Sequence, residues 1–343
     1  MRVLIDTTFA RRGPSGTAVY LDRLAPALRA LGVDVVEAAN DGRRAPAGGG
    51  LGSVRNLAAD RAWVALGLAR RAREAGADLV HHPLPAGSRA IGVPQVVTVH
   101  DMAFECLPGD FDARFRAYAR RAHRSAARRA AAVVAVSQAT AADVHERWGV
   151  DPVRIVVAPH GPGQAPATPP PRAPAPAHFL YVGDDEPRKN LAFLLAAHER
   201  YGEGAGDGAL PLVLAGSAAD PGLPGVRVVR PSAAELVALH AAAAALVHPS
   251  RHEGFGLTVL EALALGTPVV ATRSPGVAEV GGDAVAYVDP GDVAALPAEL
   301  ARLATDTRAR DELSARGRRR AAAFSWERAA REHLRAYTLA LGS

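Results

Sequence analysis

The only lysine in the chain is Lys189, although lysine and arginine together number 40. It follows Arg188 in the run YVGDDEPRKN, between a stretch that predicts a strand and an apolar stretch that predicts a helix. One explanation for these two adjacent cations is that they neutralise the negative charge of Asp184, Asp185 and Glu186 on a solvated surface. The other is that they bind a polyanion, since the first N–H groups and the dipole of a helix already attract negative charge.

A second stretch with chemically useful spacing is HPSRHEGFGLTVLEALALGTPVVAT. Gly254 and Gly256 bracket a turn that lets a ligand approach the main chain, and a helix predicted from Leu257 offers amides to phosphate. Glu253 lies in the loop and Glu261 about one turn inside the helix, up to about 12 Å away at 1.5 Å per residue. Two such carboxylates can hold hydroxyl groups at opposite ends of one ligand, whereas an isolated helical glutamate usually faces solvent.

In the first half of the chain, His100 and Asp101 follow the strand predicted in VVTVHDMAF. Ligands of open α/β sheets bind at the carboxyl ends of the strands, so both side chains are candidates for a site. A buried core histidine is the alternative for His100. His81 and His82 are adjacent on a strand and point to opposite faces, which argues against a metal pair. The sequence shows no other metal-ligand spacing, and metal independence is predicted.

A glycine-containing loop joins a predicted strand and helix in DTTFARRGPSGTAVYLDRLAPAL, residues 6–28. One interpretation of this loop is a dinucleotide-binding site in which Glu37 binds the ribose. It would indicate an NAD(P)-dependent oxidoreductase. Gly13 and Gly16 are spaced G-x-x-G instead of G-x-G-x-x-G, so the roles of the glycines do not coincide. The spacing therefore disfavours the oxidoreductase interpretation.

The composition is that of an ordinary globular protein, with 343 residues, 49% hydrophobic and 22% charged. One cysteine, Cys106, excludes an internal disulfide framework and suits a reducing cytoplasm. No apolar run approaches the roughly 18 residues of a membrane helix, and the start MRVLID predicts a strand instead of a signal peptide. The net charge of +5 is the sum of +8 over residues 1–176 and −3 over the remainder.

Twelve short apolar runs alternate with helical stretches, which predicts parallel sheets covered on both faces. The predicted strands are 2–6, 33–38, 78–82, 95–100, 132–137 and 154–159 in the first half, and 179–183, 210–216, 226–229, 245–250, 268–272 and 285–289 in the second. The fold class is therefore α/β, with two doubly wound Rossmann-like domains facing across a cleft. The expected domain boundaries are 1–165, a Pro-rich linker at 166–177, 178–325, and a C-terminal helix at 326–343 that packs back on the first domain.

The run from His248 to Thr272 resembles the donor-site signature of the family-4 retaining glycosyltransferases, which have the GT-B fold. YVGDDEPRKNLAFLLAA resembles the diphosphate-binding loop of that family, and the resemblance continues through LVLAGS, EVGGDAVAYVDPGD and FSWERAA. One departure is Asp184, where many relatives have an arginine after the glycine of this loop. The stretch VVRPSAAEL also lacks the Phe-x-Gly of many nucleotide-base sites, so the base is not assigned.

The resemblance implies a nucleoside-diphosphate sugar bound to the second domain, with no separate cofactor. It implies that Arg188 and Lys189 clamp the diphosphate, that Glu253 contacts the sugar, and that Glu261 accepts hydrogen bonds from the ribose. It places His100 beside the donor sugar, which completes the catalytic set His100, Lys189, Arg188 and Glu253. The implied donor-binding residues are Gly16, Gly183, Gly254, Phe255, Gly256, Leu257 and Glu261, and the acceptor-side residues are Gly13, Ser15, Thr17 and Asp101.

The segment FDARFRAYARRAHRSAARR carries seven arginines from Arg114 onward. A helical wheel places Phe111, Phe115, Tyr118 and three alanines on one face, which predicts a helix packed on its sheet with a solvated basic back. The alternative is an anionic docking surface over 114–129, for lipid headgroups at the inner face of the membrane or for a phosphorylated acceptor. Nucleic acid is not an expected partner.

These observations lead to the expectation of a cytoplasmic enzyme that transfers a hexose-type sugar from a nucleoside diphosphate to a hydroxyl acceptor, with retention of configuration. No carboxylate stands out as a covalent nucleophile, so the donor phosphate is expected to help deprotonate the acceptor. Two alternatives remain open: a catalytically silent sugar-nucleotide binding protein, and the oxidoreductase.

Overall fold

The computed structural model describes residues 1–343 except 11–14, 43–50, 164, 167–168 and 343. The chain divides into two compact units, of which the first comprises Met1–Gly163 with Ser325–Ser343 and the second Gln164–Phe324. Each unit is built on a six-stranded sheet whose strand pairs are all parallel. The last helix of the chain therefore completes the first unit and not the second.

The first sheet has the strand order β2-β1-β3-β4-β5-β6, and each strand overlaps one of the six ranges predicted from the sequence. Val3 and Ile5 pack into the core on one face of the sheet and Leu4 into the core on the other, because successive side chains on a strand alternate. The strands are β1 (Arg2–Asp6), β2 (Asp34–Ala38), β3 (Leu79–His82), β4 (Gln95–Val99), β5 (Ala132–Ala135) and β6 (Ile155–Val157).

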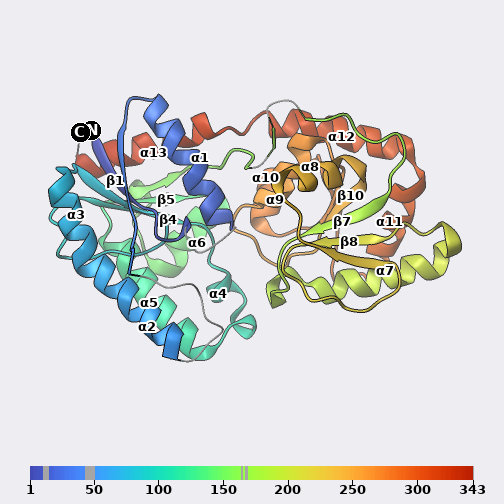
Figure 1. Ribbon diagram of the computed structural model, residues 1–343, viewed down its shortest axis with the longest axis horizontal. Helices are drawn as coiled ribbons and strands as arrows, with labels where there is room; N and C mark the ends of the chain where they lie inside the picture. Colours follow the sequence, from blue (N-terminus) through green and yellow to red (C-terminus); the bar gives the residue numbers. More distant parts are fainter. Residues whose placement is uncertain (11–14, 43–50, 164, 167–168, 343) are drawn as a thin grey trace. The chain divides into compact units, whose positions relative to one another are not determined.

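Helices cover both faces of this sheet (Figure 1). Helices α1 and α13 pack on one face beside each other, and α3, α5 and α6 contribute to the cores on the other. The helices are α1 (Gly16–Ala30), α2 (Leu51–Ala62), α3 (Leu68–Ala75), α4 (Ala103–Cys106), α5 (Ala113–Arg129), α6 (Gln138–Trp148) and α13 (Trp326–Leu341), with a π-helical turn Trp63–Gly67 between α2 and α3.

Buried polar side chains attach α13 to the rest of the first unit. The Tyr20 hydroxyl lies 2.8 Å from His333 Nε2 and 2.9 Å from Thr98 Oγ1. The Tyr337 hydroxyl lies 2.8 Å from His81 Nδ1. A buried polar group that loses its partner keeps its desolvation cost, so these contacts hold α13 in one register on the sheet.

The second sheet has the order β12-β11-β10-β7-β8-β9, and its six strands also lie at the predicted ranges. The doubly wound α/β fold is thus confirmed in both halves of the chain. The strands are β7 (His178–Val182), β8 (Leu212–Ala215), β9 (Val226–Val229), β10 (Ala243–His248), β11 (Val269–Thr272) and β12 (Ala286–Val288). The helices are α7 (Leu191–Ala205), α8 (Ala233–Ala242), α9 (Leu257–Leu265), α10 (Pro275–Gly281), α11 (Ala295–Thr305) and α12 (Thr307–Ala321).

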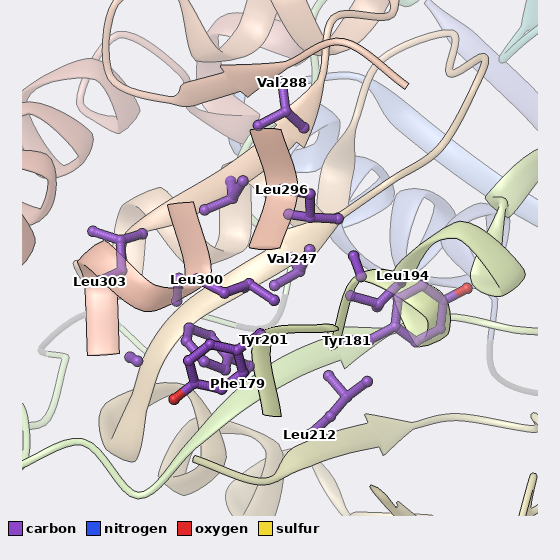
Figure 2. Packing of buried hydrophobic residues seen from close by; sticks show 14 of the residues in the cluster. Phe179, Tyr181, Leu194, Tyr201, Leu212, Val247, Val288, Leu296, Leu300 and Leu303 are labelled. Carbon is purple, nitrogen blue, oxygen red and sulfur yellow. The ribbon is translucent and has the colours of Figure 1, made fainter. Parts of the chain in front are cut away.

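The core of the second unit lies between its sheet and helices α7 and α11 (Figure 2). Phe179 and Tyr201 pack edge to face, with ring centroids 5.5 Å apart, and Leu296 and Leu300 are fully buried above the strands. The Pro-rich segment hydrogen-bonds to this unit, because Ala173 N donates to Ala241 O. Within the described residues, no helix combines the length and the apolar character needed to span a bilayer.

Acid should loosen α13, because burial lowers the pKa of His333 to about 4, below its usual value of 6.5. The unfolded chain then binds the proton more readily, so the stability that neutral His333 contributes is complete above pH 6.5 and is lost as the pH falls toward 4. The loss is about 3 kcal/mol for this one group.

The measurement is the urea midpoint at pH 7, 5.5 and 4, followed by tryptophan fluorescence. All three tryptophans, Trp63, Trp148 and Trp326, lie in the first unit, so the signal reports that unit alone. His333→Gln should reduce the pH dependence by about this amount, since glutamine takes up no proton, while His81, His100 and His160 keep their own contributions. An unchanged slope in this variant would show that other groups cause the acid sensitivity.

Candidate active site

Backbone contacts bring together the loops that follow β7 and β8. Gly216 has a φ of +151°, and a Cβ placed on it would lie 2.0 Å from the carbonyl oxygen of Gly183. The Tyr181 hydroxyl donates to the Asp184 carbonyl over 2.7 Å, and the Ser217 hydroxyl donates to the Asp184 carboxylate. The loop after Gly183 is therefore held in place by its neighbours, and both the carbonyl and the carboxylate of Asp184 have partners.

Arg188 and Lys189 lie in a short 3-10 turn, Pro187–Lys189, ahead of α7. Asn190 follows in the left-handed conformation with a φ of 56°, as the only non-glycine residue with positive φ in the described chain. It occupies the cap position of α7, but its side chain makes no cap hydrogen bond. Asparagine tolerates this backbone conformation, so the residue serves to reverse the chain between the turn and the helix.

Glu253 is the centre of a charge cluster in the second unit. Lys189 Nζ donates to its Oε1 over 2.7 Å, and Arg188 Nη1 lies 3.4 Å from its Oε2. His248 Nε2 lies 3.3 Å from Oε1. The side chains of Lys189, Arg188 and Glu253 are only 14%, 16% and 12% exposed. Arg188 Nε also donates to the carboxylate of Glu186, which is half exposed.

The protonation states of this cluster follow from its geometry. Burial raises the pKa of Glu253, but Lys189, His248 and Arg188 outweigh burial and hold the pKa well below its usual range. Burial lowers the pKa of His248, and Glu253 only partly opposes this. At neutral pH the cluster therefore consists of two cations, one carboxylate and a neutral imidazole.

The loop that carries Glu253 is packed tightly against α10. A Cβ on Gly276 would lie 2.5 Å from the Glu253 carbonyl oxygen, and Gly276 N donates to that oxygen over 3.2 Å. Gly256 has a φ of +96° and forms the cap of α9, which begins at Leu257 as predicted. The glycines thus allow close backbone packing and a sharp entry into a helix whose first turn contains no acidic residue.

Two residues predicted on the donor side have buried positions. Phe255 is 5% exposed and packs edge to face on Phe324, with ring centroids 6.0 Å apart, so it supports the loop from beneath. Glu261 is 7% exposed on α9. Its burial excludes the ordinary explanation of a solvated helical glutamate.

In the first unit, His100 follows β4 and has a distinctive environment. Burial lowers its pKa to about 4, against the raising effects of Asp101 and of the Pro83 backbone carbonyl. Its ring packs edge to face on Tyr20, with centroids 4.8 Å apart, and lies 5.5 Å from the ring of His160. Its Nε2 is buried without a hydrogen-bond partner in the described residues. His100 is therefore a neutral imidazole with one available nitrogen.

The residues predicted on the acceptor side have local roles in the structure. Ser15 caps α1 by accepting a hydrogen bond from Ala18 N at 3.2 Å, and Gly16 is the first residue of that helix. Asp101 accepts a hydrogen bond from Ala103 N at 3.1 Å. Thr17 lies in the first turn of α1, and Gly13 lies outside the described residues.

The structure brings together Arg188, Lys189 and Glu253, and adds His248, which sequence reasoning missed. The sequence feature that could have identified His248 is its position near the end of the predicted strand ALVHPS. In the structure, this strand lies beside the strand that leads to Lys189. Because β7 and β10 are neighbours in the sheet, the two loops meet at its carboxyl edge, and Arg251 N donates to Arg188 O over 2.8 Å. His100 lies in the first unit and belongs to a separate set of contacts.

Comparisons with known families decide which kind of protein carries this arrangement. Residues 14–162 match the model described as Glycosyltransferase Family 4, and residues 176–306 match the model described as Glycosyl transferases group 1. The chain belongs to the family-4 glycosyltransferases. This assignment favours the glycosyltransferase prediction over the oxidoreductase.

Individual relatives support the assignment of this glycosyltransferase chain. It is 34% identical over 183 residues to the O-antigen chain mannosyltransferase B of Escherichia coli, an alignment covering 47% of this chain and 46% of that protein. The fold resembles that of a sucrose-phosphate synthase from Thermosynechococcus elongatus, with a TM-score of 0.74, 20% identity and 98% of both chains covered. It also resembles Anabaena HepE, solved with UDP and glucose, with a TM-score of 0.70, 18% identity and 98% and 99% coverage.

These structures have the GT-B fold, and the predicted GT-B class of the chain is confirmed. The chain spans half the length of its curated relatives or less, with coverages of 46%, 27% and 49% for three of them. Their activities and substrates are therefore those of other proteins.

Removal of Lys189 should raise the pKa of Glu253, because the nearest cation that favours its ionised form is lost. In Lys189→Ala the ¹³C carboxyl resonance of Glu253, identified by its absence in Glu253→Gln, should titrate at higher pH than in the wild type. Arg308→Ala is a matched control, since Arg308 is 90% exposed and forms an ion pair with Glu312, outside the charge cluster. Equal titration midpoints in all three proteins would contradict the charge cluster.

Proposed function

We propose that the protein is a retaining glycosyltransferase that transfers a hexose-type sugar from a nucleoside-diphosphate donor to a hydroxyl acceptor. The observation that carries the proposal is the buried contact between Lys189 and Glu253, with Arg188 beside it, in a chain that contains a single lysine. The family assignment supports this activity, and the UDP and glucose bound by the structurally similar Anabaena protein are consistent with such a donor.

Lys189 and Arg188 are suited to the leaving diphosphate. An ammonium group has three N–H donors, of which Lys189 uses one on Glu253, and a guanidinium group has five. Glu253 holds both cations where the loops after β7 and β10 meet, so they are positioned before a donor arrives. Cations fixed in this way stabilise the negative charge that develops on the diphosphate as the sugar leaves, without reorganisation during the reaction.

Glu253 and Glu261 are suited to hydroxyl groups of the donor. The low pKa of Glu253 keeps it ionised, so it acts only as a hydrogen-bond acceptor and not as a general acid. Glu261 supplies a second buried carboxylate on α9. The N-terminal amides of α9 and the close backbone at Gly254–Gly256 offer donors for the phosphates.

His100 is suited to contact the sugar from the first unit, since it is neutral and its buried Nε2 is available to accept a hydrogen bond. The acceptor hydroxyl loses its proton to an oxygen of the leaving phosphate on the same face of the sugar, as the new glycosidic bond forms and the bond to the diphosphate breaks. No side chain is required as a covalent nucleophile in this scheme, and configuration is retained.

Nucleotide binding tests the donor site directly. UDP, GDP, ADP and dTDP are each added to the wild type, Lys189→Ala and Arg308→Ala in a thermal-shift panel. One nucleotide should stabilise the wild type and Arg308→Ala, by about 2.7 kcal/mol at 100 times its Kd, and Lys189→Ala should lose most of that gain. Equal shifts in Lys189→Ala and the wild type would refute a phosphate contact from Lys189.

Turnover of the matching nucleotide sugar distinguishes an enzyme from the alternative of a silent binding protein. Lys189→Ala should lower kcat on the order of 100- to 1,000-fold, because its contact strengthens as charge develops. Release of nucleoside diphosphate is measured with and without EDTA, since metal independence remains a prediction and turnover should survive chelation. Donor binding without any release of diphosphate would favour the silent protein.

A further inference from the structure

The first unit contains a pocket of about 650 Å³ that none of the predicted catalytic, donor-binding or acceptor-side residues lines, although the predicted docking surface over 114–129 contributes to it. Its volume lies within the roughly 300–1,000 Å³ typical of small-molecule sites. The pocket begins at the carboxyl end of β1, with Asp6 and Thr8, and extends between the π-helical turn and α5. Ligands of doubly wound sheets bind at this edge.

One wall of the pocket is an indole ring held in place from two sides. Trp63 Nε1 donates to Asp6 Oδ1 over 3.3 Å, and Thr8 N donates to the same oxygen over 3.0 Å. A Cβ on Gly67 would lie 2.3 Å from the Trp63 ring, so glycine is needed there for the ring to fold along its own helix. Glycine weakens a helix interior by about 1 kcal/mol, and π-helical turns occur frequently at functional sites.

The opposite wall corrects an expectation from the sequence. The helical wheel predicts that Phe115 and Tyr118 pack on the sheet, yet they are 48% and 37% exposed, and both line the pocket. Of the predicted face, Ala119 and Ala126 are buried as expected, and Ala127 is the third buried residue of α5. Because alanine side chains are short, α5 packs closely on the core while its larger aromatic side chains face the cavity.

Three arginines lie at this pocket, Arg61, Arg121 and Arg129. None of the three has a carboxylate partner in the described part of the chain. By contrast, Arg120, which precedes Arg121 on α5, forms a 2.5 Å ion pair with Glu105. The Arg61 guanidinium lies over the ring of Tyr118, 5.1 Å from its centroid. Asp6 is 1% exposed, and its Oδ1 accepts hydrogen bonds from Trp63 and Thr8. The three arginines therefore outnumber the two carboxylates that line the pocket, Asp6 and Asp60.

We propose that this pocket binds the acceptor, and that the acceptor carries a phosphate group on an apolar or ring-shaped body. Guanidinium groups bind phosphate oxygens through paired N–H donors, and aromatic side chains stack on rings and cover apolar chains. Asp60, also at the pocket, provides an acceptor for hydroxyl groups. The inference rests on the proposed function and names the class of its second substrate.

The test uses phenyl phosphate as a probe and the full-length protein. The chain has three tryptophans, so the indole N–H resonance of Trp63 is identified by its loss in Trp63→Phe. Phenyl phosphate should shift this resonance saturably. Phenol and inorganic phosphate, which each lack half of the probe, should bind on the order of tenfold more weakly or worse.

Two variants address the two walls. The first variant replaces Arg61, Arg121 and Arg129 by glutamine (Arg61→Gln, Arg121→Gln, Arg129→Gln), and it should weaken phenyl phosphate binding on the order of tenfold or more. The second variant, Gly67→Ala, should displace the Trp63 resonance before any ligand is added. The matched control replaces Arg23, Arg114 and Arg128 by glutamine, which removes the same charge from residues of the same unit that do not line the pocket. Equal binding in the wild type and the pocket triple variant, or no saturable shift at all, would overturn the proposal.

Two further experiments are needed. The first distinguishes a lipid phosphate from a soluble one, and the second distinguishes failure of the pocket from failure of the proposed function. Vesicles of phosphatidylcholine and phosphatidylglycerol in equal amounts replace the soluble probe: a Trp63 shift with vesicles places the phosphate on a lipid, and a shift only with phenyl phosphate places it on a soluble acceptor. Nucleotide binding by the second unit should be intact in the pocket triple variant. Probe binding without nucleotide binding in the wild type would overturn the donor site but leave the pocket, and the reverse result would overturn the pocket alone.

Discussion

Burial of a carboxylate costs several kcal/mol unless cations and hydrogen bonds replace its lost hydration, and this requirement organises the second unit around Glu253. Lys189 and Arg188 meet it from the loop after β7, and the ring of His248 lies beside the carboxylate at the end of β10. Three backbone features serve the same requirement, because they keep the two loops close enough for the cations to reach Glu253. They are the 3-10 turn, the left-handed Asn190 and the close contact at Gly276. Charge and close backbone packing, more than apolar contact, hold these loops together.

Much of this arrangement could be predicted from the sequence. A strand buried on both faces needs an unbroken run of apolar residues, so β5, β8 and β10 were recognisable without knowledge of their partners. Gly256 and the helix after it were recognisable for a similar reason, since a turn with positive φ followed by a helical period is a local pattern. Features that are local in the chain were therefore the ones that the sequence predicted well.

Features that depend on distant neighbours were not predictable in this way. His248 contacts Glu253 only because β10 lies next to β7, and strand order is not encoded in either strand alone. The helical period identified the face of α5 that holds Phe115 and Tyr118, but a period does not say what lies opposite that face. The sequence around Trp63 and Gly67 matches no motif that we recognised, because the close contact between them arises from the π-helical turn.

The position of α13 in the first unit has a consequence for synthesis on the ribosome. The first sheet is complete by Val157, yet Tyr20 and His81 find their partners His333 and Tyr337 only after the whole second unit has been made. At about 5–20 residues per second, the roughly 160 intervening residues take on the order of ten to thirty seconds. During that interval the part of the first sheet that α13 covers has no covering helix, so the first unit reaches its final core only after the second unit has been made.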